Sequence, residues 1–442
     1  MLSKTGASSE DVPSAQATQH RDWNGPAVYA LVMLTLISTF NYLDRNILGL
    51  ALPAIKSEMG VSDTALGLVS GLAFVLFYSL LGVPIAWLAD RWNRRNIITL
   101  GLIFWSLMTA VTGVVTNIWQ LALTRFLMGA GEACGLAPSN SMISDLFRQA
   151  RRPLALSIFG LAGALSFAVL FPIAGWIVEL WGWRMMFVAA GAPGILLGLV
   201  FFLTVREPER GASEEQKRSL EKSPIVETAR FLGGSRTYLL ILGGITMTGA
   251  NSFAASIWVP TFLERVHGLS MGEIASTLGP LRGILQAVGI LAGGVLIDRL
   301  GRRSEQLRLR IPALSCLILG PAELLFLLGG TRAEWVVGYG LTSFFLLMHQ
   351  APVFAVALNV SRVRMRAVSI SILVFFATLV GQVVGPLMIG VLNDLLEPSF
   401  GDLSIRYSML FLAATAVLAG VLFWLAANTV EADIRRASGM NT

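Results

Sequence analysis

Twelve runs of mostly apolar residues follow one another along this chain of 442 residues. Each is close to the length of about 20 residues that a helix needs to cross a bilayer. Because lipid offers no hydrogen bonds to an open backbone, such runs must cross as helices. We therefore expect an all-α membrane protein whose twelve transmembrane helices cover residues 27–50, 65–88, 97–115, 119–143, 154–178, 185–205, 237–262, 273–297, 311–329, 334–357, 367–392 and 406–427.

The composition agrees with this class and excludes others. Hydrophobic residues make up 55% of the chain and charged residues 14%, whereas soluble domains have about 45–50% and about 25%. These values exclude a soluble enzyme, a secreted disulfide scaffold and a disordered regulator. The net charge of +6 is typical of positive cytoplasmic loops, so we expect no nucleic-acid partner.

The only long hydrophilic connection, residues 206–236, has six spans on either side. It divides the chain into a disordered cytoplasmic tail, an N-terminal six-helix bundle, a cytoplasmic linker, a C-terminal six-helix bundle and a second cytoplasmic tail. The expected boundaries of these five parts are 1–26, 27–205, 206–236, 237–427 and 428–442.

The basic residues predict the orientation. Of the 33 lysines and arginines, 25 lie in segments on the side of the N-terminus and five in segments on the other side. Cytoplasmic loops carry such an excess. We therefore expect a multi-pass protein of the cell inner (plasma) membrane with both termini in the cytoplasm, and we expect a monomer.

Similar motifs recur in the two halves. D-R-W-N-R-R follows the second span at residues 90–95, and D-R-L-G-R-R follows the eighth span at residues 298–303. Parallel repeats of six helices around a site near the membrane midplane are typical of transporters. Gly-x-x-x-Gly pairs also predict close contacts between helices, at residues 67/71, 279/283, 289/293 and 381/385.

These motifs resemble those of the major facilitator superfamily over residues 27–427. The first copy has Ala86 and Asn93 where the superfamily has glycines. Together with D-R-x-N-R-R, the segments N-Y-L-D-R-N, R-F-L-M-G-A-G-E-A and S-D-L-F resemble its Spinster-type branch, at residues 41–46, 125–133 and 144–147. The resemblance implies two pseudo-symmetric six-helix bundles and transport of a lysophospholipid or sphingoid phosphate by alternating access. Organic-anion symporters of the superfamily share the N-Y-L-D-R and G-E-A elements and are the alternative.

Ionisable residues inside the predicted spans indicate where the chemistry lies. Each costs at least about 2.5–3.5 kcal/mol at a helix centre, so each needs a reason to be there. Their formal charges sum to zero, which favours mutual pairing. The six residues are Asp44, Arg45, Arg125, Glu132, Arg282 and Glu323.

Four of these six lie on spans 1 and 4, which the resemblance places around a central cavity. By the helical rise, Asp44 lies at a depth between Arg125 and Glu132, and the latter two share one helix face. Burial favours a protonated carboxyl group, and a nearby guanidinium favours its ionised form. We therefore expect Asp44, Glu132, Arg125 and Arg45 to couple transport to protons, with Arg125 able to pair with Asp44. A purely structural ion-pair network is the alternative.

The expected substrate contacts combine these charges with residues of the C-terminal half. Arg282 either holds an anionic head group, because a guanidinium can form two parallel hydrogen bonds to a phosphate or carboxylate, or pairs with an outer-loop acid or with carbonyl oxygens. Glu323 is expected to be structural. Because spans 7 and 10 carry no carboxylate or arginine well inside the span, one half of the cavity is charged and the other largely apolar, which favours a small amphipathic or anionic substrate. The expected contacts are Arg45, Arg125, Glu132, Arg282, Asn251, Trp258 and His349.

The inner-loop motifs imply gates by resemblance. Asp90 is expected to attract the N-terminus of span 11 beside Arg364 and Arg366, and Asp145 to pair with Arg91 or Arg95. Asp298 with Arg302 is expected to face span 5 near Arg151 and Arg152. Such inner locks would stabilise an outward-open state, and a role as topology determinants alone is the alternative. The gating residues are Asp90, Arg91, Arg94, Arg95, Asp145, Asp298, Arg302 and Arg303.

Other classes of function lack their motifs. The chain has no Gly-Lys pair for a nucleotide-binding loop and no His/Asp/Ser or metal-ligand cluster, so we expect no enzyme, metal or cofactor. We expect a proton-coupled secondary transporter of an amphipathic, lipid-like substrate, with protons and membrane lipids as partners. The alternatives are an organic-anion:proton symporter, a facilitative uniporter and a lipid receptor that does not transport.

Overall fold

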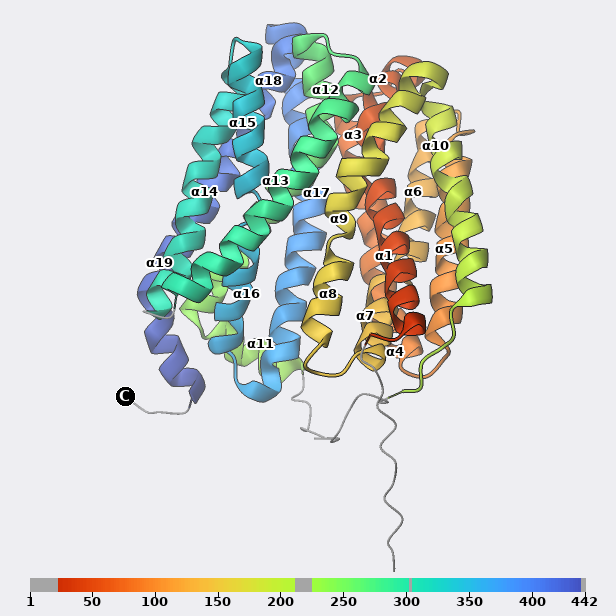
Figure 1. Ribbon diagram of the computed structural model, residues 1–442. Coiled ribbons are helices and arrows are strands. Elements are labelled where there is room, and N and C mark those ends of the chain that lie inside the picture. The colour runs from red at the N-terminus through yellow and green to blue at the C-terminus, as the bar shows by residue number, and fades with distance from the viewer. Residues whose placement is uncertain (1–22, 211–224, 302–303, 439–442) are drawn as a thin grey trace, which may run out of the picture.

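The computed structural model describes residues 23–210, 225–301 and 304–438, and across these residues every regular element is a helix (Figure 1). The predicted tails and linker fall partly outside this range, and Arg302 and Arg303 lie outside it.

The described residues contain nine helical stretches that are long and apolar enough to cross a membrane. Two of these, Arg152–Thr204 and Val363–Ser438, each hold two crossings that a turn at Gly182 or Gly401 separates. Residues 118–146, whose helix is interrupted, supply one further crossing. The twelve predicted membrane helices are therefore confirmed.

The first six crossings are formed by short and long helices with several internal breaks. Their elements are α1 (Gly25–Asn46), α2 (Leu48–Met59), α3 (Asp63–Leu68), the π-helix η1 (Val69–Ala73), α4 (Phe74–Ala89), α5 (Arg94–Thr112), α6 (Ile118–Glu132), α7 (Leu136–Leu146), α8 (Arg152–Gly160), α9 (Ala162–Leu165), the π-helix η2 (Ser166–Leu170) and α10 (Phe171–Thr204).

The second six crossings contain fewer breaks. Their elements are α11 (Ile225–Gly233), α12 (Arg236–His267), α13 (Met271–Leu300), α14 (Glu305–Leu328), α15 (Arg332–Phe345), α16 (Gln350–Asn359), the 3₁₀ helix η3 (Val363–Met365), α17 (Arg366–Phe400), the 3₁₀ helix η4 (Gly401–Leu403), α18 (Ser404–Ser408) and α19 (Leu410–Ser438).

Helices also occupy parts of the segments predicted to be a linker and a C-terminal tail. The short helix α11 lies in the segment predicted to be a linker, and α19 continues to Ser438 although its predicted span ends at residue 427. Polar residues allow this continuation, because a helix that leaves the bilayer can present its polar side chains to water.

The fourth crossing is broken beside a proline. α6 ends at Glu132 and α7 begins at Leu136. Pro138 lies in the first turn of α7, where its missing N–H cannot bond the carbonyl of Cys134 and its ring disfavours a continuous helix. This break leaves Glu132 at a helix end instead of within a helix.

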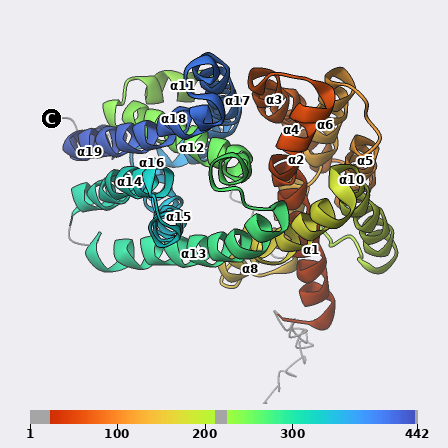
Figure 2. The same ribbon diagram turned by 90° about the horizontal axis from the view of Figure 1, so that it is seen from above.

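The two halves lie side by side, with α1–α10 in one group and α11–α19 in the other (Figure 2). The start of α1 and the end of α19 lie at the same face of the molecule (Figure 1). We call it the terminus face and the opposite face the distal face. The loop between α2 and α3 and the turn between α12 and α13 lie at the distal face (Figure 1).

Glycines bring the halves into backbone contact toward the distal face. A Cβ added to Gly67 of α3 would lie 2.6 Å from the carbonyl oxygen of Pro386 on α17. A Cβ added to Gly279 of α13 would lie 2.7 Å from the carbonyl oxygen of Phe167 on η2. Only glycine fits such approaches, so these two Gly-x-x-x-Gly predictions of close contact are confirmed.

Candidate functional site

A buried ion pair joins α1 to α6. Arg45 Nε donates to Glu132 Oε2 at 2.6 Å. The Glu132 side chain has no exposed surface, whereas 17% of the Arg45 side chain is exposed. The Arg45 guanidinium also lies 4.5 Å from the ring centre of Tyr78 and 5.1 Å from that of Phe74. Arg45 is therefore the member of the pair that a ligand can reach.

Both members of this pair lie at helix ends inside the fold. Arg45 is in the last turn of α1, and Glu132 is the last residue of α6. The C-terminal end of a helix carries a partial negative charge, which stabilises a cation and destabilises a carboxylate. The ionised form of Glu132 therefore depends on Arg45.

Asp44 and Arg125 lie next to this pair. Arg125 Nη1 donates to the main-chain oxygen of Asp44 at 3.0 Å, and Thr109 and Trp105 lie beside the Asp44 carboxyl group. The sequence correctly predicts that Arg125 approaches Asp44. It does not predict that the contact is to the backbone, nor that Arg45 is the partner of Glu132.

Several polar atoms of this cluster have no hydrogen-bond partner among the described residues. They are Asp44 Oδ1, Glu132 Oε1 and Arg125 Nε. All three residues are almost fully buried. Because buried polar atoms in native proteins are nearly always hydrogen-bonded, these atoms offer bonding capacity to a proton or a ligand.

The residues predicted in the C-terminal half are buried among its own helices or at its contact with α3. Asn251 Nδ2 donates to Glu323 Oε1 and to the carbonyl oxygen of Leu412, both at 2.9 Å. Trp258 Nε1 donates to the carbonyl oxygen of Pro386 at 2.9 Å. The imidazole of His349 stacks on the ring of Phe423. In this conformation, all three side chains therefore serve packing.

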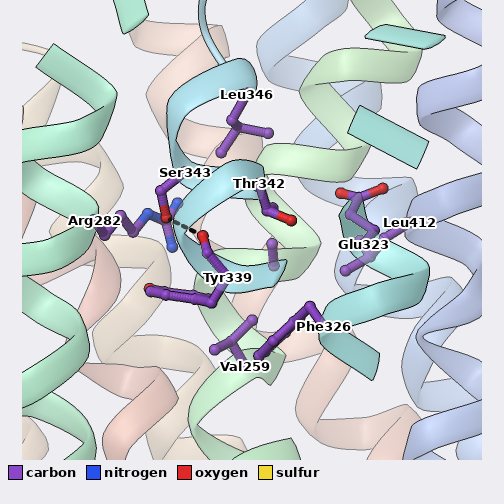
Figure 3. Close-up of a pocket in the computed structure, with 10 residues that line it drawn as sticks. Val259, Arg282, Glu323, Phe326, Tyr339, Thr342, Ser343, Leu346 and Leu412 are labelled. Atoms are coloured by element: carbon purple, nitrogen blue, oxygen red, sulfur yellow. Dashed lines mark hydrogen bonds between the residues drawn. The ribbon is translucent and has the colours of Figure 1, made fainter. Parts of the chain in front are cut away.

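Arg282 lies between the two halves. Its Nη2 donates to Ser256 Oγ at 2.7 Å, and its guanidinium lies 4.3 Å from the ring centre of Phe167 in the first half. Ser343 and Tyr339 lie in front of it, and Glu323 lies on the opposite side of the same small cavity (Figure 3). Neither an outer-loop acid nor a carbonyl oxygen is its hydrogen-bond partner among the residues that the structure describes.

A charged cluster that sequence reasoning missed closes the distal face. Both terminal nitrogens of Arg265 on α12 donate to the two carboxylate oxygens of Asp63 on α3, at 2.7 and 2.9 Å. Lys56 lies 3.2 Å from the same carboxylate. Asp394 of α17 accepts hydrogen bonds from the backbone N–H groups of Asp63 and Thr64. We call these four ionisable residues the distal lock: Lys56, Asp63, Arg265 and Asp394.

The predicted gating residues of the terminus face contact their own half. Arg94 donates to Asp145 and Glu207, so Arg94 is a partner of Asp145 that the sequence does not predict, and the pairing of Asp145 with Arg91 or Arg95 stays a prediction. Arg91 lies over the ring of Trp87, and Arg95 lies over the ring of Phe202. The Arg94 side chain is buried and lies next to the carboxylate of Asp145 on α7.

The expected lock between Asp90 and span 11 is likewise absent from the contacts of the described residues. The main-chain oxygen of Asp90 accepts from Arg210 of its own half. Arg364 pairs with Glu227 of α11 at 3.1 Å, and Arg366 donates to the carbonyl oxygen of Leu358. The physical reason is the conformation: the halves meet through the distal lock, not at the terminus face.

The chain has relatives over nearly its whole length. It is 29% identical to an MFS-type efflux pump of Mycolicibacterium smegmatis, over 94% of this chain and 97% of that protein. It is 28% identical to protein spinster homolog 1 of Homo sapiens, over 97% and 86%. It is 26% identical to a probable galactarate/D-glucarate transporter of Bacillus subtilis, over 70% and 73%.

A solved structure has the same arrangement of helices. It is the inward-facing, unoccupied conformation of a bacterial homologue of the human lysosomal transporter Spinster, with a TM-score of 0.83 and 27% identity over 93% of this chain and 99% of that one. The sequence profile of the Major Facilitator Superfamily matches residues 34–386. The chain therefore belongs to the Major Facilitator Superfamily, as a Spinster-like transporter.

Proposed function

We propose that this transporter moves an amphipathic anion, a lysophospholipid or a sphingoid phosphate, by proton-coupled alternating access. The observation that carries the proposal is the Arg45–Glu132 ion pair, which lies at two helix ends inside the first half. A buried pair that served stability alone could be replaced by apolar side chains without loss. Ionisable residues within membrane helices are more often functional.

Proton coupling follows from a change of partner at Arg45. An anionic group that binds the exposed part of the Arg45 guanidinium competes with Glu132 for the same donors. Glu132 then loses its counter-charge while it stays buried at the C-terminal end of α6, which favours its protonated form. The anion and the proton are thus bound together. Asp44 receives or supplies this proton, because its carboxyl group lies in the same cluster.

The distribution of charge supports an amphipathic substrate. The charged cluster belongs to α1 and α6 of the first half, whereas the predicted polar contacts of the second half serve packing. A head group held by Arg45 and Arg125 would leave its chain against apolar and aromatic surface. The resemblance to the Spinster-type branch favours the same class of substrate.

The contacts at the distal face and at the terminus face support alternating access. The distal lock holds the halves together at one face, and the arginines of the terminus face contact their own half. This arrangement is that of an inward-facing transporter, in agreement with the conformation of the similar solved structure. In the opposite state, we expect the distal lock to break and Asp90 to approach the N-terminus of α17, as the sequence predicts.

The second candidate is an organic-anion:proton symporter. The relative named as a probable galactarate/D-glucarate transporter favours it, and Arg45, Arg125 and Arg282 would then hold a small carboxylate. A facilitative uniporter would need the same cation cluster but no titrating carboxyl group. For all three candidates we propose a monomer in the inner membrane with both termini in the cytoplasm, and the excess of lysines and arginines on that side supports this orientation.

Uptake by proteoliposomes separates these candidates. We expect proteoliposomes that contain the purified protein to accumulate radiolabelled lysophosphatidylglycerol in response to a pH gradient. We expect them not to take up radiolabelled D-glucarate. Uptake of D-glucarate alone would favour the organic-anion symporter. Accumulation that does not respond to the pH gradient would favour the uniporter, and binding without accumulation would indicate a receptor.

A further inference from the structure

The cavity beside Arg282 lies inside the second half, between α12, α13, α14, α15 and α19 (Figure 3). Most of its wall is apolar. Its polar side chains are Arg282 on one side, Glu323 on the other, and three hydroxyl groups of α15 near them: Tyr339, Thr342 and Ser343. The cavity is separate from the Arg45–Glu132 pair, which lies between α1 and α6 of the first half.

Glu323 is fully buried in this wall and has no cationic partner among the described residues. Its Oε1 accepts from Asn251 Nδ2 at 2.9 Å, while Oε2 has no hydrogen-bond partner in the described part of the chain. Thr342 Oγ1, which lines the same cavity, is also without a partner there. An isolated carboxylate in such surroundings costs far more than a neutral carboxyl group. The surroundings of Glu323 therefore favour the neutral carboxyl group.

The other titratable groups near Glu323 do not neutralise it. Cys316 lies on the same helix and is buried. Tyr339 and Arg282 line the cavity, and His349 is turned to the ring of Phe423. Of these groups, Arg282 alone is a permanent cation, and it contacts Ser256, Tyr339 and the face of Phe167.

Arg282 is held in place by contact with the other half. Phe167 belongs to η2 of the first half, where its carbonyl oxygen also meets Gly279. When the distal face opens, the halves separate there and the ring of Phe167 leaves the guanidinium. Arg282 Nε has no hydrogen-bond partner among the described residues even now. Glu323, on the far wall of the same cavity, is the acid that lines this cavity with it.

We propose that Glu323 is a second proton-exchange site of the transporter, protonated while the distal face is closed and ionised when Arg282 is released from Phe167 and turns toward it. The O–H bond of the Glu323 carboxyl group breaks, its electron pair stays on the carboxylate, and the proton passes to water in the opened distal pathway. This inference rests on the proposed coupling to protons and adds a carboxyl group in the half where the sequence predicts no proton site.

Infrared spectroscopy of the purified protein tests the protonation directly. At neutral pH, we expect the C=O absorption of protonated carboxyl groups to lose intensity in Glu323→Gln relative to the unmodified protein. The exposed acid Glu273, changed to Gln in the same half, is the matched control and leaves this absorption unchanged. Equal absorption in the unmodified protein and Glu323→Gln would overturn the proposal, whether or not a lysolipid is the substrate.

Uptake by proteoliposomes tests whether Glu323 exchanges its proton during transport. In proteoliposomes, Glu323→Gln should lower the stimulation of lysophosphatidylglycerol uptake by a pH gradient by about fivefold or more, and Glu273→Gln should not. Arg282→Gln should have the same effect as Glu323→Gln, and the double variant no further effect, because both changes remove one pair. Additive losses, or an unchanged response in Glu323→Gln, would contradict the exchange.

These two measurements separate this inference from the proposed function. If lysophosphatidylglycerol is not transported, the proposed substrate fails while the infrared result still decides the state of Glu323. If Asp44→Asn and Glu132→Gln remove the response to pH and Glu323→Gln does not, the proposed coupling holds and the second site fails. If Glu323→Gln does not fold, Arg282→Gln carries the transport test alone.

Discussion

Arg265 and Asp63 form a bidentate ion pair at the distal face, with N···O distances of 2.7 and 2.9 Å. Arg265 belongs to α12 of the second half and Asp63 to the N-terminus of α3 in the first. The Asp63 side chain is 1% exposed and that of Arg265 13% exposed. The pair therefore acts across the interface that must open during transport, and the loss of one partner would leave a buried charge uncompensated.

Asp63→Asn should shift the protein toward a state that is open at the distal face. Removal of one partner from a buried ion pair costs about 3–5 kcal/mol, and even about 1.4 kcal/mol of that changes a population ratio tenfold. We expect a membrane-impermeant maleimide to label Leu387→Cys, in a background without Cys134 and Cys316, about tenfold faster. The exposed pair Arg332–Glu273 lies within the second half, so Arg332→Gln should leave the labelling rate unchanged. Equal rates in Asp63→Asn and its parent would contradict the role of the distal lock.

Gly67→Val should hold the distal face apart by steric contact. A Cβ at this position would lie 2.6 Å from the Pro386 carbonyl oxygen and 3.1 Å from the Cα of Leu387, and backbone cannot yield as a side chain does. We expect faster maleimide labelling at the distal face and loss of transport, since the closed state is no longer reached. Gly82→Val is the matched control, because nothing lies within 4 Å of a Cβ there. A fully active Gly67→Val protein would show that α3 and α17 need not pack so closely.

Arg94→Met should destabilise the first half. The Arg94 side chain is buried and donates to the carboxylates of Asp145 and Glu207, to Ser141 and to the Pro208 carbonyl oxygen. Its loss removes a cation that contacts both carboxylates, and the loss of one partner of a buried pair costs about 3–5 kcal/mol. We expect a clear fall in the midpoint of thermal unfolding in detergent.

Arg91→Met is the control for this prediction. Arg91 is more exposed and contacts only the ring of Trp87 and its carbonyl oxygen among the described residues, so its replacement should change the midpoint little. An equal fall in the two variants would show that loss of positive charge at the terminus face matters more than the contacts of Arg94.

The membrane spans and the approach of Arg125 to Asp44 could be predicted from the sequence, for different reasons. Runs of apolar residues determine the crossings because lipid excludes other structures. The depth of Asp44 and Arg125 follows from helical rise alone, so their approach was predictable. The partner of Glu132 was not, because helical rise gives nearly the same depth for the adjacent residues Asp44 and Arg45 and does not say which of them faces Glu132.

The distal lock could not be predicted from the sequence. Asp63, Lys56 and Arg265 lie outside the predicted spans and belong to different halves, and nothing in their spacing indicates that they meet. The one signal is Ser62, which caps α3 and predicts that Asp63 begins a helix. The expected lock between Asp90 and span 11 stays a prediction, which we propose for the opposite conformation.

The most direct test of the central claim is the response of uptake to a pH gradient in Asp44→Asn and Glu132→Gln proteoliposomes. If Glu132 takes up a proton when an anion occupies Arg45, the gradient should drive accumulation by the unmodified protein. It should drive none by the two variants, which should remain folded with an unchanged elution profile. Unchanged dependence on the pH gradient in both variants would contradict the account.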